Sequence, residues 1–135
     1  MSAWATSQMD LPGAFYRIRA TGKPVHLPIE LNAYTEGLKL TFSDPLDPAS
    51  AEDSRNYNIS TWELKRTSRY GSDHYNTKTL EVASAKLSDD GKILKLTIPG
   101  IEPVWQMQID YKLAGANGDP VTGKLQNTIH HLREP

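Results

Sequence analysis

Cysteine is absent from the 135 residues of the sequence. Disulfide bridges and thiolate metal sites are therefore excluded, and the free energy of folding must come from apolar burial. The absence is compatible with an oxidising compartment and with the cytosol, so it leaves the location open. The length fits a single domain that can bury a core of useful size.

An excess of charge of either sign is also missing. Lys and Arg number 15 against 16 Asp and Glu, which gives a net charge of -1. A chain with so little net charge has no long-range field to attract phosphate backbones, so we expect no nucleic-acid partner. No apolar run approaches the roughly 20 residues that a membrane helix needs, so we expect no membrane span. Residues 1–10 lack the apolar centre of a signal peptide.

Helical periodicity is missing as well, whereas strand periodicity is clear. Residues 101–113 alternate between polar positions and a set of apolar, aromatic or Pro residues, which are Ile101, Pro103, Trp105, Met107, Ile109, Tyr111 and Leu113. Alternation with a period of two is typical of a strand with one buried face. We therefore predict that this stretch is the central strand.

Shorter alternating segments occupy most of the remaining chain and are separated by turn sequences such as Asp90-Gly91. They predict an all-β fold, an antiparallel immunoglobulin-like β-sandwich of about seven to eight strands. We expect a mobile lead-in over residues 1–13, one domain over 14–131, and a frayed C-terminus over 132–135. The expected core residues are Tyr16, Ile18, Leu27, Ile29, Leu38, Leu40, Phe42, Leu94, Leu96, Ile98, Met107, Ile109 and Tyr111. His26 shares the outward parity of its strand.

Several motifs together resemble a known family. They include Phe15-Tyr16-Arg17-Ile18-Arg19, Thr21-Gly22-Lys23-Pro24-Val25, Gly37-Leu38-Lys39-Leu40-Thr41-Phe42, Asp44-Pro45-Leu46-Asp47-Pro48, Asn56-Tyr57, Ser84-Ala85-Lys86-Leu87-Ser88 and Asn127-Thr128-Ile129. With these motifs the chain resembles the C-terminal bacterial Ig-like module of large secreted multidomain proteins of the planctomycete and verrucomicrobial group, which is similar to the Ig-like domains of surface-layer proteins. The resemblance implies a non-catalytic accessory module, in the periplasm or outside the cell, with the neighbouring domains of a parent chain as partners.

The sequence departs from that family at two places. Leu64 and Arg66 stand where relatives carry further aromatic residues, and Trp105 replaces a smaller apolar residue. The first departure leaves fewer aromatic rings after Trp62 to form a flat binding surface. The second enlarges the expected core or forces a local shift.

A candidate binding site follows from the parity of Trp62. Tyr57 and Ile59 share one strand face, and Trp62 has the opposite parity, so either a bulge intervenes or Trp62 faces away from the core. The polar loop after it would be presented to solvent by a rigid sandwich. The expected ligand-binding residues are Trp62, Arg66, Arg69, Tyr70, Asp73, His74 and Tyr75.

Exposed rings that stack on sugar faces would make this a carbohydrate-binding module with a polysaccharide as its partner. The alternative is that Trp62 plugs one end of the core. In that case the ligand-binding site is not formed, and the chain is instead a structural spacer or a protein-docking module.

Catalytic and metal sites are not predicted, and neither is a cofactor. His26, His74, His130 and His131 include no pair with the spacing of two ligands on one strand face. No serine lies in a nucleophile elbow and no Gly-rich loop suits a phosphate. Two alternatives stay open: a metal-dependent enzyme built on distant histidines, and a loop Ca²⁺ site. The second would use Asp44, Asp47, Glu52 and Asp53, for which helix capping and turn formation are the competing roles.

Overall fold

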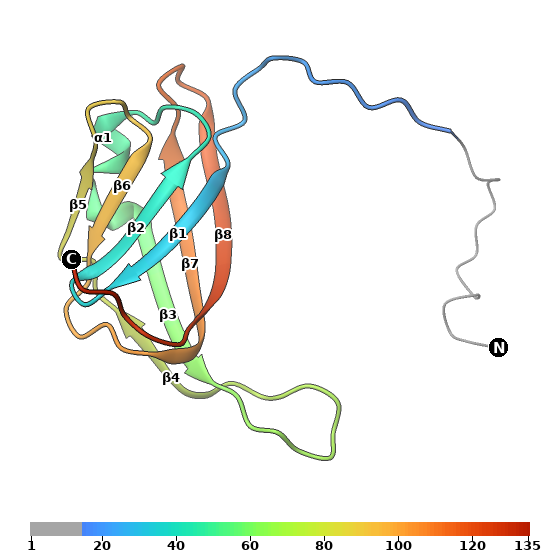
Figure 1. Cartoon of the computed structure of the whole chain (residues 1–135), viewed down its shortest axis with the longest axis vertical. Helices are drawn as coiled ribbons and strands as arrows, with labels where there is room; N and C mark the ends of the chain where they lie inside the picture. The colour runs from blue at the N-terminus through green and yellow to red at the C-terminus, as the bar shows by residue number, and fades with distance from the viewer. Residues whose placement is uncertain (1–14) are drawn as a thin grey trace.

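The computed structural model describes residues 15–135 as a sandwich of two antiparallel sheets with four strands each (Figure 1). One sheet has the order β1 (Pro28–Tyr34), β2 (Gly37–Phe42), β6 (Ile93–Thr97) and β5 (Ser84–Leu87). The other has the order β4 (Tyr75–Leu80), β3 (Tyr57–Glu63), β7 (Val104–Ala114) and β8 (Pro120–Ile129). The predicted all-β antiparallel sandwich is confirmed. Within residues 15–135, no helix is long and apolar enough to span a membrane.

The core lies between the two sheets, and β7 supplies its centre. Met107 and Ile109 have no exposed surface, and Tyr111 packs edge-on against Phe42 with ring centroids 5.9 Å apart. These residues are the inward set of the alternating stretch 101–113, so the central strand was predicted correctly. The other predicted core residues that are buried are Leu38, Leu40, Leu94, Leu96 and Ile98.

The predicted core residues that precede the first strand are not in the core. Tyr16 and Ile18 were expected in the core, but both are exposed, and the segment that carries them extends away from the sandwich (Figure 1). Residues 15–19 alternate as a strand would, but they form no strand in the described structure, in which β1 begins at Pro28. Alternation makes a segment suitable for a strand, but a strand also needs a partner with which to form a ladder. The lead-in expected over residues 1–13 lies outside the described residues.

The parity around β1 is also inverted. Leu27 and Ile29 were expected in the core and are exposed, whereas His26, expected to point outward, is buried. Two local features explain the difference. His26 adopts a positive φ of 51°, and the β1–β2 register shifts between Pro28 and Glu30. Each feature breaks the simple alternation of inward and outward side chains.

Residues 43–56 form the loop that crosses from one sheet to the other. It contains one helical turn, α1 (Pro48–Ala51), and a 3-10 turn, η2 (Ser54–Asn56), that follows it. Asp47 and Asp53 cap these two turns by accepting backbone N–H groups at 2.9 and 3.0 Å. Their carboxylates therefore perform the capping role that competed with a Ca²⁺ site.

The C-terminal residues contact the end of β1 and the core. Arg133 forms an isolated parallel bridge with Tyr34, and its backbone exchanges two hydrogen bonds of 3.0 Å with Ala33 and Thr35. Leu132 packs partly buried against the core. The fraying expected over residues 132–135 stays a prediction beside these contacts.

Candidate functional site

Two β-bulges lie at the same end of the sheet that contains β3 and β7. The β3–β4 register shifts between Thr61 and Glu63, and the β7–β8 register shifts between Val104 and Met107. A bulge adds a residue to one strand and redirects its side chains. Trp105 has the inward parity of Met107, yet 61% of its surface is exposed. Its expected place among the inward residues of the central strand is therefore wrong.

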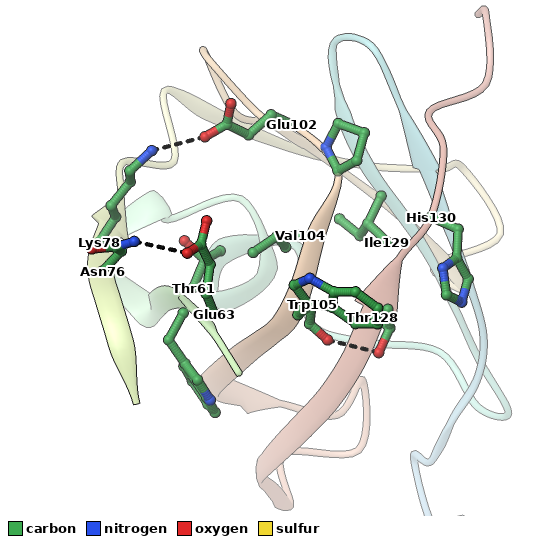
Figure 2. Close-up of a pocket in the computed structure, with 12 residues that line it drawn as sticks. Thr61, Glu63, Asn76, Lys78, Glu102, Val104, Trp105, Thr128, Ile129 and His130 are labelled. Carbon is green, nitrogen blue, oxygen red and sulfur yellow. Dashed lines mark hydrogen bonds and ion pairs between the residues drawn. The ribbon is translucent and has the colours of Figure 1, made fainter. Parts of the chain in front are cut away.

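Trp105 borders an open hollow of about 360 Å³, which we call the Trp105 cleft (Figure 2). Strands β3, β4, β7 and β8 and the segment before β7 contribute to it. Its lining residues are Thr61, Trp62, Glu63, Asn76, Lys78, Glu102, Pro103, Val104, Trp105, Thr128, Ile129 and His130. The position at one end of a rigid sheet presents these side chains to solvent at fixed spacing.

Polar side chains form the rim of the Trp105 cleft opposite the indole ring. Asn76 Nδ2 donates a hydrogen bond of 2.7 Å to Glu63 Oε2, and Lys78 Nζ pairs with Glu102 Oε1 at 2.8 Å (Figure 2). The hydrogen bond from Lys78, supported by its charge, lowers the pKa of Glu102. Both partners of this ion pair are exposed, so it contributes little to stability. Its consequence is to hold a carboxylate and an ammonium group in place at the rim.

A second hollow, of about 640 Å³, lies on another side of Trp105 and is formed with the loop between β3 and β4. We call it the loop hollow. Its lining residues are Leu64, Lys65, Arg66, Thr67, Arg69, Tyr70, Gly71, Ser72 and Trp105. The exposed indole therefore borders two hollows, one walled by sheet residues and one by a projecting loop (Figure 1).

Trp62 does not take the place that was expected of it. It lies outside the main core cluster, and a register shift occurs beside it in the β3–β4 pairing. The ring is nevertheless only 5% exposed. His74 stacks on it with ring centroids 4.2 Å apart and planes at 16°. Of the two alternatives left open for Trp62, the structure shows a covered ring, with His74 stacked on it.

The other expected site residues, apart from His74, line two overlapping hollows on the loop between β3 and β4. Arg66, Arg69 and Tyr70 line the loop hollow with Trp105, and Tyr70 is fully exposed. Arg69 and Tyr70 also line a smaller hollow with Asp73 and Tyr75, and Lys65 Nζ lies 4.2 Å from the centroid of the Tyr75 ring. Trp62 and His74 line neither hollow. The sequence analysis missed Trp105 because its parity matches the core, and the available signal was its unusual size for that position.

Histidines do not gather in the described structure. His26 is buried against Gly115, His74 covers Trp62, and His130 lines the Trp105 cleft. Within residues 15–135, no three or more His, Asp or Glu side chains are grouped as a metal site would require.

Metal independence of folding is one testable expectation. The core is a continuous cluster of apolar side chains, and burial of that kind stabilises a fold without coordination. We expect the urea unfolding curve of the protein to be the same with and without excess EDTA, as followed by tryptophan fluorescence. A midpoint that falls on chelation and returns when Ca²⁺ or Zn²⁺ is added would contradict this expectation.

Comparisons with known proteins give a likeness of fold only. No protein-family model matches the chain, and no curated protein matches it. A solved structure of surface layer protein SbsC, domains 1–6, is similar over 75% of this chain and 13% of that chain, with a TM-score of 0.55 and 20% identity. The N-terminal part of the bacterial S-layer protein SbsC is similar over 73% of this chain and 23% of that one, with a TM-score of 0.52 and 20% identity. This chain thus spans less than a quarter of either structure.

Proposed function

We propose that the chain is a non-catalytic module of an extracytoplasmic multidomain protein and that it binds a polysaccharide along Trp105. The observation that carries the proposal is the indole ring, 61% exposed, between the Trp105 cleft and the loop hollow. A large exposed ring on a rigid scaffold is a feature of binding surfaces. The site differs from the one expected around Trp62, which His74 covers.

The groups beside the ring suit a sugar. Glu63 and Glu102 can accept hydrogen bonds from hydroxyl groups, and Asn76 and Lys78 can donate to them. All four line the Trp105 cleft. Both hollows are open to solvent, whereas a site for a small ligand encloses most of it. An extended polymer that passes over Trp105 from the loop hollow to the cleft fits this shape.

Weak binding is expected from such a surface. One or two stacked rings and a few exposed polar contacts must offset the loss of translational and rotational freedom. Dissociation constants in the range from high micromolar to millimolar follow. Several modules on one parent chain would raise the overall avidity without any new contact.

Replacement of Trp105 by alanine tests the proposal. We expect native gels that contain soluble β-glucan, xylan, mannan or pectin to retard the wild-type protein with at least one polymer, and Trp105→Ala to remove that retardation because the stacking surface is lost. Thr122→Ala is the control, since it changes an exposed, uncharged side chain of the same sheet that lines neither hollow. It should migrate as the wild type does. Equal retardation of Trp105→Ala and the wild type would contradict the proposed site.

A structural module that holds neighbouring domains is the second candidate. It is favoured by the burial of Trp62 and by an exposed apolar flank at the start of the domain, formed by Phe15, Tyr16, Ile18, Val25, Leu27 and Ile29. Wild-type protein that no polysaccharide retards would leave this candidate in place. The fold shared with surface layer proteins and the resemblance in sequence support an extracytoplasmic location for either role, which fractionation of cells that make the parent protein would check.

A further inference from the structure

Exposed apolar side chains concentrate in the segment that precedes β1. Among the described residues, six of the nine large apolar side chains that are exposed lie between positions 15 and 29. Phe15, Tyr16 and Ile18 belong to the part that extends away from the sandwich (Figure 1). Exposed apolar surface of this density marks an interaction site. The flank therefore needs a partner surface.

A surface suited to a strand exists on the sandwich itself. β1 and β8 are terminal strands of opposite sheets, and they lie along the same flank of the molecule (Figure 1). A groove of about 190 Å³ runs between them. We call it the seam groove, and its lining residues are Leu31, Asn32, Ala33, Asn127, Thr128, Ile129, His130, His131 and Arg133. Terminal strands carry backbone groups that can pair with an added strand, although on the β1 edge the carbonyl of Ala33 and the N–H of Thr35 already bond to Arg133.

One buried polar atom also points to a missing partner at the seam groove. Asn127 Oδ1 is buried and has no hydrogen-bond partner among residues 15–135. Such atoms are rare because the cost of leaving one unpaired is high. Asn127 lies on β8 and lines the seam groove. A donor from an added strand would satisfy it.

The apolar flank has the pattern that the seam groove requires. In an extended conformation Tyr16 and Ile18 point to one side, and Arg17 and Arg19 point to the other. The apolar side would enter the groove against Leu31, which is partly buried on the core, and the arginines would face solvent. Five extended residues span about 17 Å, which is close to the length of a typical strand.

The chain leaves the sandwich in a direction that favours a neighbouring molecule. The backbone N–H groups of Val25 and His26 donate to Asp44 Oδ2 at 3.1 and 3.2 Å. His26 is itself buried and held at a positive φ of 51°. These contacts fix the exit of the segment, which then runs outward from the sandwich (Figure 1).

We propose that residues 15–19 of one copy of this chain add as a strand to the seam groove between β1 and β8 of a second copy. The added strand would bury Tyr16 and Ile18, pair with backbone groups of the β1 or β8 edge that Arg133 does not use, and bring a donor to Asn127 Oδ1. This is strand addition between copies, in which main-chain hydrogen bonds give affinity and alternate side chains give specificity. The proposal does not rest on polysaccharide binding, because it uses residues 15–19 and Asn127 and not the Trp105 ring, although Thr128, Ile129 and His130 line both the Trp105 cleft and the seam groove.

Cross-linking between two singly substituted proteins tests the contact directly, since the natural sequence has no cysteine. Ile18→Cys protein is mixed with Leu31→Cys protein, and separately with Asn127→Cys protein because the register of the added strand is open. Mass spectrometry then identifies disulfide-linked peptides after mild oxidation. Lys112→Cys, exposed on β7, is the control for random collision.

The expected result is a mixed disulfide from residue 18 to residue 31 or 127 at a yield at least about tenfold above the Lys112 control. A yield equal to that control would overturn the proposal. So would an Ile18→Cys/Leu31→Cys double variant that links within one chain while the mixed single variants do not, because the segment would then occupy the groove of its own molecule.

Sedimentation velocity over a concentration series gives a second measurement on the full chain. Wild-type protein is expected to self-associate, and Ile18→Ser to weaken the association about tenfold or more by removing a buried aliphatic side chain. Arg17→Ser is the matched control on the opposite side of the segment, and its association constant should stay within about threefold of the wild type. Wild-type protein that remains monomeric at several hundred micromolar, or equal effects of the two substitutions, would overturn the proposal.

Discussion

Replacement of Met107 by alanine is expected to reduce the free energy of unfolding by about 2 to 5 kcal/mol. Met107 lies at the centre of β7, has no exposed surface, and belongs to the main core cluster. Alanine would remove the buried thioether chain and leave a cavity that the surrounding side chains fill only in part. The loss is a large fraction of the total stability of a domain of this size.

Urea titration and thermal melting followed by circular dichroism measure this loss. A fall of roughly 10 °C in melting temperature is expected for the Met107→Ala variant. Lys112→Ala is the control on the same strand, because its side chain is exposed and should change the stability by less than about 0.5 kcal/mol. If both variants melted at the wild-type temperature, β7 could not be the central strand of the core.

Replacement of Gly37 by alanine is expected to cost about 2 to 6 kcal/mol, the sum of a backbone term and a packing term. Gly37 begins β2 with a φ of 149°, a value that side-chain-bearing residues rarely adopt. A Cβ atom at this position would collide with the carbonyl oxygen of Leu96 on the neighbouring strand. Gly37 pairs with Tyr34 on one side and Thr97 on the other, so the collision would force β1, β2 or β6 to move.

Gly100→Ala separates the two terms in this prediction. Gly100 also has a positive φ, of 74°, but no atom lies within 4 Å of an added Cβ. Alanine at Gly100 therefore carries the backbone term alone, and Gly37→Ala should be less stable than Gly100→Ala by about 1 to 3 kcal/mol in the same urea titration. Equal stability of the two variants would show that β6 yields to the new methyl group at no cost.

Residue alternation along the chain predicted only part of the candidate site. The exposed loop after Trp62 was predicted, and Arg66, Arg69 and Tyr70 do line a hollow. The ring at its border is Trp105, which alternation had assigned to the core. Parity counts residues along one strand, whereas a bulge depends on the register of two strands. The covering of Trp62 by His74 likewise depends on how the loop between β3 and β4 folds back.

Residue alternation was sufficient to predict the fold class, the central strand and nine of the thirteen residues expected in the core. Alternation of apolar and polar residues is a local property, and it specifies a strand with one buried face wherever a partner strand is present. Which alternating segments pair with another strand, and which aromatic rings are exposed to solvent, depend on the tertiary structure. Residues 28–34 pair with β2, whereas residues 15–19 carry the same kind of pattern and pair with no strand in the described structure. Trp105 is open and Trp62 is covered because bulges and loop contacts arise from pairing between distant segments, and one strand's pattern does not encode that pairing.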